Sequence, residues 1–540
     1  LRELAEGASR QVAEKLVPVA ARHPTAQEMR EVGTRDPEAW RQLRRARRAA
    51  RMDYFEQVRL LANDAIRRDP EFPMAWLELD LTYNPEDQAR LPILDKVIEL
   101  GDRAQGLSPL SKLGVEFARQ SRHGDEAAVA RVLESWGALP LEGLDLLYVK
   151  TRLAREAFIR GQPDAGFPLL EWVAEKWPQD AAAFKQLLDE YLSDEEPPAL
   201  ALAVRHGKRA VALAPEDVAA RANLAQALLL AGDAAAARAH VAILAAADPE
   251  DKQGASTSEQ SNRLFELHLA LGDIQEASAD ARRLMAGSPL QRAQGRAALA
   301  AVDLARGAFD DGLAERAAAA EEYERLHMDS LALHAHWEHA RAAYALGRYA
   351  EVVAVARRIR RGNADARRTL GGLSARRILT LETVARMDAG WLPTNPTNIG
   401  ALRQQVGSLL GGPVPRDIDM LIHLRLRDWA GVVSAYRDLQ GRVTILGIVY
   451  PAAHALEQLG QKEEAMRLYE RLATHPNAWY HPYRRGQAWL RLGILREERG
   501  DLAGARQAYE SLLRLWDLAP RAQPEIREAE QRLKALGAGS

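Results

Sequence analysis

Apolar and polar residues follow one another with the period of an amphipathic helix along most of this chain of 540 residues. The clearest example is RLGILREERGDLAGARQAYESLLRLW (Arg491–Trp516), in which Gly500 and Asp501 separate two apolar stripes. Glycine adopts the left-handed conformation that ends a helix, and aspartate caps the N-terminus of the next helix. The pattern therefore predicts two antiparallel helices joined by a tight turn.

The same spacing recurs along the chain. In most copies a small residue lies seven positions before the turn glycine, another lies five positions after it, and a larger residue lies nine positions after it. The further turn glycines are Gly161, Gly232, Gly272 and Gly460, with weaker copies at Gly124, Gly307 and Gly347. Neighbouring turns are often 35, 37 or 40 residues apart, which is the length of a helix-turn-helix repeat. The repeat predicts an all-α solenoid of antiparallel helix pairs.

Two stretches depart from this rhythm and suggest the domain limits. Residues 1–35 are expected to form an N-terminal helix and linker, the edge of a preceding domain. Residues 36–361 form the N-terminal part of the array. Residues 362–417 are rich in Pro, Gly and Asn, so we expect an irregular insertion or an atypical repeat at which the array bends or divides. Residues 418–540 are expected to hold the C-terminal repeat units and a capping helix.

Composition narrows the class of protein. The 73 basic and 75 acidic residues give a net charge of −2, which does not favour a nucleic-acid partner. The chain has no cysteine, which excludes disulfides, Cys-ligated zinc and thiol catalysis. No apolar run is long enough to span a bilayer, so we expect no membrane insertion. We expect a cytoplasmic location, or an extracytoplasmic one if a transmembrane segment precedes Leu1.

The sequence contains no motif of an enzyme. It has no glycine-rich phosphate loop, no nucleophile elbow and no H-E-x-x-H helix, so we predict no catalytic residue and no cofactor. In HAHWEH (His334–His339), His336 and His339 are three positions apart and share a helix face, as metal ligands do. No third ligand is marked, so we favour a core or groove role for these histidines and predict no metal.

Arginine clusters are the remaining candidates for charge recognition. One is WRQLRRARRAAR (Trp40–Arg51) and the other is ARRIRRGNADARR (Ala356–Arg368). Such clusters bind acidic peptides, phosphates or nucleic acid. In a chain this rich in arginine they are more often solvated helix faces, and we favour that interpretation.

The repeat units resemble tetratricopeptide repeats over nearly the whole chain, most closely at 216–249, 257–289, 446–476 and 486–517. The resemblance implies a right-handed superhelix in which the first helix of each pair lines a concave groove. It implies that groove residues of this chain bind the partner. These are Trp40, Arg44, Arg47, Tyr148, Arg152, Arg155, Phe158, Asn223, Asn262, His334, Trp337, Arg341 and Tyr344.

Longer passages, Asp36–Leu79, Gly106–Asp125 and Gly500–Leu536, resemble the C-terminal repeat region of large bacterial signalling proteins. There the repeats follow a serine/threonine kinase or a winged-helix regulator domain. The resemblance implies a non-enzymatic scaffold that binds a protein or peptide and regulates an attached or associated effector. The alternative is a regulatory domain that senses a small molecule or nucleic acid through its Arg-rich helices.

Overall fold

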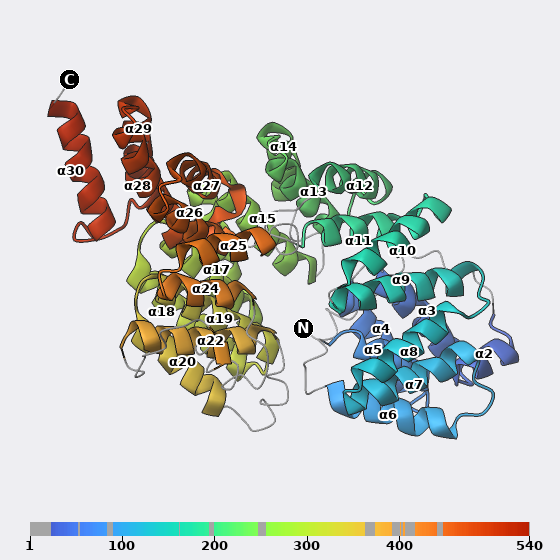
Figure 1. Ribbon diagram of the computed structural model, residues 1–540. Helices are drawn as coiled ribbons and strands as arrows, with labels where there is room; N and C mark the ends of the chain where they lie inside the picture. The colour runs from blue at the N-terminus through green and yellow to red at the C-terminus, as the bar shows by residue number, and fades with distance from the viewer. Residues whose placement is uncertain are drawn as a thin grey trace. The chain divides into compact units, whose positions relative to one another are not determined.

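The computed structural model describes residues 23–51, 54–83, 90–160, 162–193, 199–246, 255–361, 373–390, 400, 403–404, 416–439 and 446–538. Within these ranges every regular element is a helix, and no strand occurs (Figure 1). Consecutive helices pack against each other in antiparallel pairs, such as α17 with α18 and α28 with α29. The predicted all-α solenoid of helix pairs is confirmed.

The chain divides into two compact units. Unit 1 holds the residues up to Tyr191 with Ala201–Ala227 and Ile243–Glu259, and unit 2 holds Leu192–Leu200, Leu228–Ala242 and all residues from Gln260 on. The helices up to α13 are α2 (Ala26–Val32), α3 (Pro37–Arg51), α4 (Phe55–Arg68), α5 (Pro73–Asp80), α6 (Leu91–Arg103), α7 (Pro109–His123), α8 (Glu126–Gly137), α9 (Gly143–Ile159), α10 (Pro163–Lys176), α11 (Ala181–Tyr191), α12 (Leu200–Leu213) and α13 (Val218–Leu230).

The elements that follow belong largely to unit 2. They are α14 (Ala234–Ala246), α15 (Ala255–Leu271), α16 (Ile274–Met285), α17 (Pro289–Ala305), α18 (Phe309–Arg325), α19 (Asp329–Ala345), α20 (Tyr349–Arg361), α22 (Leu373–Asp388), α24 (Arg416–Arg425), α25 (Trp429–Leu439), η2 (Leu446–Ile448), α26 (Val449–Gln458), α27 (Lys462–Thr474), η3 (Pro476–Tyr480), α28 (Pro482–Glu498), α29 (Leu502–Leu515) and α30 (Pro524–Ala538).

Much of the irregular stretch expected at 362–417 lies outside the described residues, although α22 occupies its middle and the stretch belongs to unit 2. The division between the units falls instead between residues 191 and 260. Residues 1–22 also lie outside the described part, and α2 follows them with a capping box at Thr25. The domain limits drawn from the sequence remain predictions.

The turns between paired helices have the chemistry that the sequence predicts. Gly500 has a φ of 87°, which only glycine adopts without strain. The side chain of Asp501 then accepts a hydrogen bond of 2.9 Å from the Gly504 amide, and Asp125 accepts one of the same length from Ala128. Asp273 does not cap its helix by a side-chain hydrogen bond. Turn glycines thus end the first helices, and most of the following aspartates start the second ones.

The small residues of the repeat serve close packing. A Cβ atom added at Gly493 would lie 2.4 Å from the Tyr509 ring, so this ring can lie against α28 only because position 493 is glycine. The Tyr509 hydroxyl donates a hydrogen bond of 2.7 Å to Glu497. The equivalent Tyr469 donates one of 2.9 Å to Glu457 in the preceding pair. The large residue of the repeat therefore fills the interhelix space and satisfies its own polar atom.

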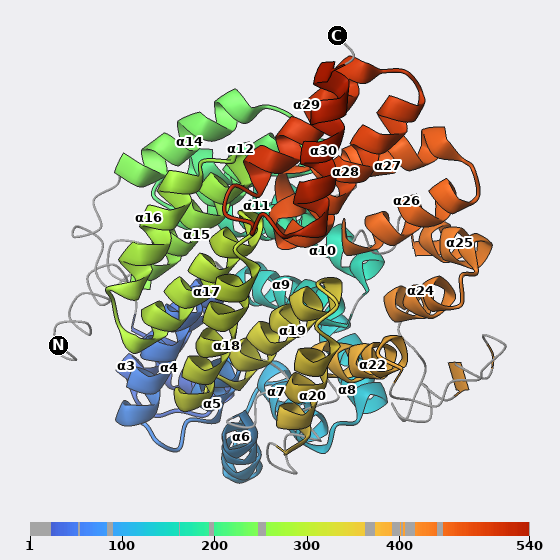
Figure 2. The ribbon, with the colours of Figure 1, turned by 90° about the vertical axis from the view of Figure 1, so that its left-hand side faces the viewer.

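Within unit 2 the chain folds back on itself. Helices α15 to α20 follow one another as successive rows (Figure 2), and α28 contacts both α17 and α19. The Leu518 amide donates a hydrogen bond of 3.0 Å to the Arg306 carbonyl, and the Phe309 and Trp516 rings meet edge to face at 5.0 Å. The C-terminal helices thus cover part of the face formed by α17 and α19, a closure that the repeat pattern does not predict.

Candidate functional site

In unit 1 the predicted groove residues are part of a buried polar network. Arg47 is 8% exposed and its Nε donates to Glu78 Oε1 over 2.9 Å, while Glu78 is fully buried. The Tyr148 hydroxyl donates to the same oxygen over 2.8 Å, and the Arg47 guanidinium lies over the Tyr148 ring at 4.7 Å. Burial lowers the pKa of Arg47, but Glu78 outweighs this effect and the pKa is raised overall. These residues join α3, α5 and α9 through intrachain contacts.

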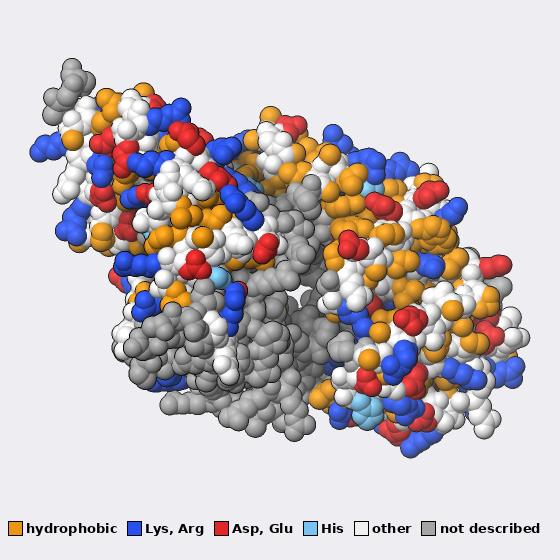
Figure 3. All heavy atoms as spheres, viewed as in Figure 1, with side chains coloured by type: hydrophobic (Ala, Val, Ile, Leu, Met, Phe, Trp, Pro, Cys, Tyr) orange, Lys and Arg blue, Asp and Glu red, His pale blue; other side chains and the backbone are white. Residues whose placement is uncertain are grey.

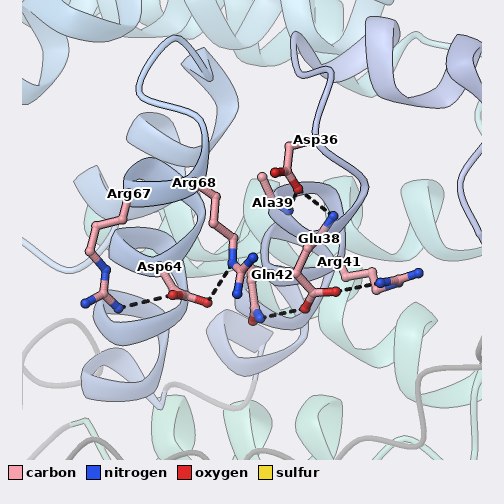
Figure 4. A network of polar contacts seen from close by, with 8 residues as sticks. All are labelled: Asp36, Glu38, Ala39, Arg41, Gln42, Asp64, Arg67 and Arg68. Carbon is pink, nitrogen blue, oxygen red and sulfur yellow. Dashed lines mark hydrogen bonds and ion pairs between the residues drawn. The ribbon is translucent and has the colours of Figure 1, made fainter. Parts of the chain in front are cut away.

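Three other arginines of α3, Arg41, Arg44 and Arg51, are also paired within the chain. Arg44 lies over the Trp40 ring at 5.5 Å and pairs with Asp145 at 3.1 Å. Arg51 forms an ion pair with Asp180. Figure 4 shows that Arg41 at the start of the helix pairs with Glu38, its neighbour one turn earlier. Since these cations already have carboxylate partners, the cluster is largely an intramolecular ion-pair surface.

The aromatic and arginine residues of α9 pack inside unit 1 as well. Arg152 is 5% exposed, lies over the Phe117 ring at 5.2 Å and pairs with Glu156 at 3.3 Å. The Arg155 guanidinium lies over the Phe55 ring at 4.4 Å. Phe158 packs edge to face on Phe167 at 5.0 Å, and Asn223, on α13, donates a hydrogen bond to Asp189. The structure thus places these predicted site residues in intrachain contacts.

Unit 2 brings its predicted residues together around a pocket of about 380 Å³. Its walls come from α15, α17, α18 and α19 on one side and from η2, η3 and the start of α28 on the other. All five predicted groove residues of this unit line the pocket, namely Asn262, His334, Trp337, Arg341 and Tyr344. This volume is typical of small-ligand sites.

The charged wall of the pocket is centred on the carboxylate of Glu338, which contacts two arginines. Glu338 accepts a hydrogen bond from Arg341, and Arg316 lies 3.5 Å from the same carboxylate oxygen. Burial by itself raises the pKa of Glu338, but the two arginines outweigh it and lower this pKa to about 2. Arg341 also donates to His481 Nδ1 and to the Tyr480 carbonyl, each over 2.7 Å. Arg341 therefore connects α19 to the last residue of η3 and to the residue that follows it.

Sequence reasoning missed Arg316 and Tyr323, which reach the pocket from α18, the second helix of its pair. The Arg316 side chain is 13% exposed and makes no hydrogen bond within the described chain. The sequence does contain an indication of this role for Arg316. Arg316 lies on the apolar stripe of its helix, together with Leu313, Ala320 and Tyr323, where a charged side chain is unexpected.

The aromatic wall comes from distant parts of the sequence. Trp479 and Tyr480 stack with ring centroids 3.8 Å apart, and Tyr483 packs edge to face on Phe309 at 5.5 Å. The Tyr344 hydroxyl donates to Asp388 over 2.8 Å, so its polar end is already used by the fold. The repeat pattern does not indicate that the segment at 479–484 meets α17 and α19, since only the closure of unit 2 brings them together.

Two of the three histidines of HAHWEH lie beside different carboxylates. His336 Nε2 lies 2.8 Å from Glu324, and His339 Nε2 lies 3.5 Å from Glu351. His334 lines the pocket, and burial lowers its pKa. No group of three or more His, Asp or Glu side chains in the described ranges is arranged to hold a metal ion. No helix of the described part is long and apolar enough to cross a membrane.

The second arginine cluster lies partly outside the described residues, from 362 on. Within the described part, Arg358 pairs with Glu321 at 2.9 Å and with Glu324. On the face of the molecule seen in Figure 3, basic and acidic side chains are intermingled. This distribution of charge resembles a solvated surface more than a nucleic-acid binding face.

Comparisons with known proteins place this chain in no family. No protein-family model matches the chain, and no curated protein matches it. Among solved structures, the crystal structure of yeast Tom70 aligns over 93% of this chain and 96% of that one, at 13% sequence identity and a TM-score of 0.20. Similarity this low carries no conclusion about partners, and the helix-pair fold rests on the geometry described above.

Proposed function

We propose that this chain is a non-catalytic repeat scaffold that binds a peptide segment of a partner protein on unit 2. The observation that carries the proposal is the convergence of Asn262, His334, Trp337, Arg341 and Tyr344 on one pocket. These residues were singled out because the first helices of repeat pairs line the binding face of such arrays. Pockets that combine tryptophan, tyrosine and arginine are typical of the hot spots that dominate protein interfaces.

The corresponding residues of unit 1 do not support a second groove of this kind. Arg47, Tyr148 and Arg152 are buried and bonded to other parts of unit 1. The alternative of a sensor that uses its Arg-rich helices loses support for the same reason, since Arg44 and Arg51 of α3 are paired with acidic residues. Partner binding is therefore assigned to unit 2.

Selection of random peptides displayed on phage against the full chain tests the scaffold proposal. We expect enriched peptides that bind the free chain in titration calorimetry. Trp337→Ala should weaken their binding about 30-fold, because truncation of a hot-spot residue costs about 2 kcal/mol. Trp172→Ala removes an indole from α10 of unit 1, outside the pocket, and is the matched control. An absence of binders, or binders that do not distinguish the two variants, would contradict the proposal.

We further propose that the scaffold regulates a kinase or winged-helix transcription regulator of a bacterial signalling system, either attached to it or associated with it. The support is the order of the passages Asp36–Leu79, Gly106–Asp125 and Gly500–Leu536, which resembles the repeat region of such proteins. Sequencing the gene on the 5′ side of the Leu1 codon, together with its neighbours, tests this context. The absence of both effector types from the gene and its neighbourhood would count against it.

A further inference from the structure

The pocket of unit 2 contains an arginine whose charge is incompletely paired. Arg316 has one ion-pair partner among the described residues, Glu338, at 3.5 Å, and its buried Nε has no hydrogen-bond partner. Glu338 is shared with Arg341, to which it is hydrogen-bonded. Burial lowers the pKa of Arg316, and the attraction of Glu338 does not restore it. By contrast, Arg47 has a hydrogen-bonded carboxylate of its own and a raised pKa.

The balance of charge in the pocket favours an anion. Three guanidinium groups line it, those of Arg316, Arg341 and Arg484, against the carboxylates of Glu266 and Glu338. Burial raises the pKa of Glu266, which is also 3.5 Å from Arg263 outside the pocket lining. The pocket therefore carries a positive excess that a bound carboxylate would neutralise.

A second donor lies on the same helix. Tyr323 is 5% exposed, lines the pocket and has no hydrogen bond to its hydroxyl within the described chain. Burial raises its pKa to about 12, so the hydroxyl keeps its proton near neutral pH and can donate it to an acceptor. Arg316 and Tyr323 are seven positions apart on α18 and hence lie on one face of this helix. The Arg316 Nε is buried without a partner, and such a donor costs free energy that an acceptor in the pocket would recover.

The rest of the lining suits a flat apolar body. Trp337, Tyr480 and Tyr483 supply rings, and Ala298, Ala301 and Leu304 supply aliphatic surface from α17. Because η3 and α28 form the opposite wall, the site is bounded on both sides, as a small-molecule site is.

We propose that this pocket binds a free small molecule composed of an aromatic ring and a carboxylate, with Arg316 and Tyr323 as the donors to the carboxylate. The ring then lies against the aromatic wall and displaces water from it. The inference rests on the pocket alone and does not require that the chain binds a peptide.

Phenylacetate and its neutral analogue phenylacetamide are the probes, titrated into the full chain by calorimetry and by saturation-transfer NMR. We expect phenylacetate to bind about tenfold or more tightly than the amide, as a hydrogen bond to a charged group provides. Acetate, which lacks the ring, should not compete for the site. Arg316→Gln should abolish the preference for the acid, whereas Arg296→Gln on α17, outside the pocket lining, should preserve it.

Two further variants test the proposal independently, in case Arg316→Gln does not fold correctly. Tyr323→Phe removes only the hydroxyl and should weaken phenylacetate binding severalfold. Glu338→Gln removes the carboxylate that competes for Arg316 and should strengthen phenylacetate binding, a gain that a purely structural role would not produce. The proposal is overturned if neither probe binds, if acid and amide bind equally, or if the preference survives both Arg316→Gln and Tyr323→Phe. Selected peptides that bind while phenylacetate does not would leave the scaffold proposal standing and overturn this one.

Discussion

Replacing Glu78 by alanine should destabilise unit 1 strongly. Glu78 is fully buried and accepts hydrogen bonds from Arg47 over 2.9 Å and from Tyr148 over 2.8 Å. The change removes the only carboxylate that is hydrogen-bonded to Arg47 among the described residues, and Arg47 is 8% exposed. Removing one partner of a buried ion pair costs about 3–5 kcal/mol, mainly because the other charge stays buried. The cost of the unpaired charge exceeds the cost of the lost methylene groups. We therefore expect the free energy of unfolding of unit 1 to fall by an amount in this range.

Native-state hydrogen exchange measured by mass spectrometry can locate this loss. Peptides from α3, α5 and α9 report the free energy of opening around Glu78, and peptides from α17 and α19 in unit 2 are an internal reference. We expect protection to fall in the first set, by the factor that corresponds to about 3–5 kcal/mol, and to change little in the second.

A compensated variant separates the buried charge from general damage to the core. In the triple variant Glu78→Leu, Arg47→Met, Tyr148→Phe, the three polar groups joined by these hydrogen bonds are replaced by apolar groups of similar size. Such replacements are often neutral or stabilising, so most of the lost protection should return. A loss below about 1 kcal/mol in Glu78→Ala, the size of a surface ion pair, would refute the argument. So would a triple variant as unstable as the single one.

Three other changes probe the repeat frame and the pocket. Gly493→Val should cost about 1–3 kcal/mol in urea unfolding, because its Cβ would lie 2.4 Å from the Tyr509 ring. Asp501→Ala should cost about 1 kcal/mol because it removes a helix cap, whereas Asp273→Ala should cost less in the same assay because Asp273 makes no side-chain cap bond. The pKa of Glu338 in the folded protein, about 2, is below its unfolded value of 4.5. The contribution of Glu338 to stability is therefore present above pH 4.5 and is lost as the pH falls towards 2. In acid titrations of unfolding, the difference in free energy of unfolding between the wild type and Glu338→Gln, about 3 kcal/mol at most, should shrink over this range.

The sequence predicted the architecture because the determinants of a helix pair are local. A turn glycine such as Gly500, a capping residue such as Asp501 and a small residue such as Gly493 act within a few tens of residues. Periodicity therefore reveals them without knowledge of the tertiary fold. The division of the chain into two units between residues 191 and 260 depends on contacts between distant helices, so the local pattern did not indicate it.

The candidate site was only partly predictable, for a related reason. The face of a helix follows from its phase, and the predicted residues His334, Trp337 and Arg341 of α19 line one pocket. Phase does not reveal what lies opposite that face. In unit 1 the opposite groups include carboxylates such as Glu78, which accepts a hydrogen bond from the predicted groove residue Arg47. In unit 2 the opposite wall comes from residues more than a hundred positions later, such as Tyr480.

The closure of unit 2 links its stability to the shape of the pocket. Trp516 is 2% exposed and holds two rings of the pocket lining, with Phe309 edge to face at 5.0 Å and Tyr483 stacked at 5.5 Å. The indole fits there because Gly486 leaves room, since a Cβ at that position would lie 2.1 Å from the ring. Trp516 lies at the end of the helix pair that matches the repeat pattern most clearly. The same pair therefore also holds two aromatic residues of the pocket in place. Regular packing residues of the C-terminal pair position the aromatic wall, whereas the charged wall comes from α18 and α19, where the Arg316 Nε lacks a hydrogen-bond partner.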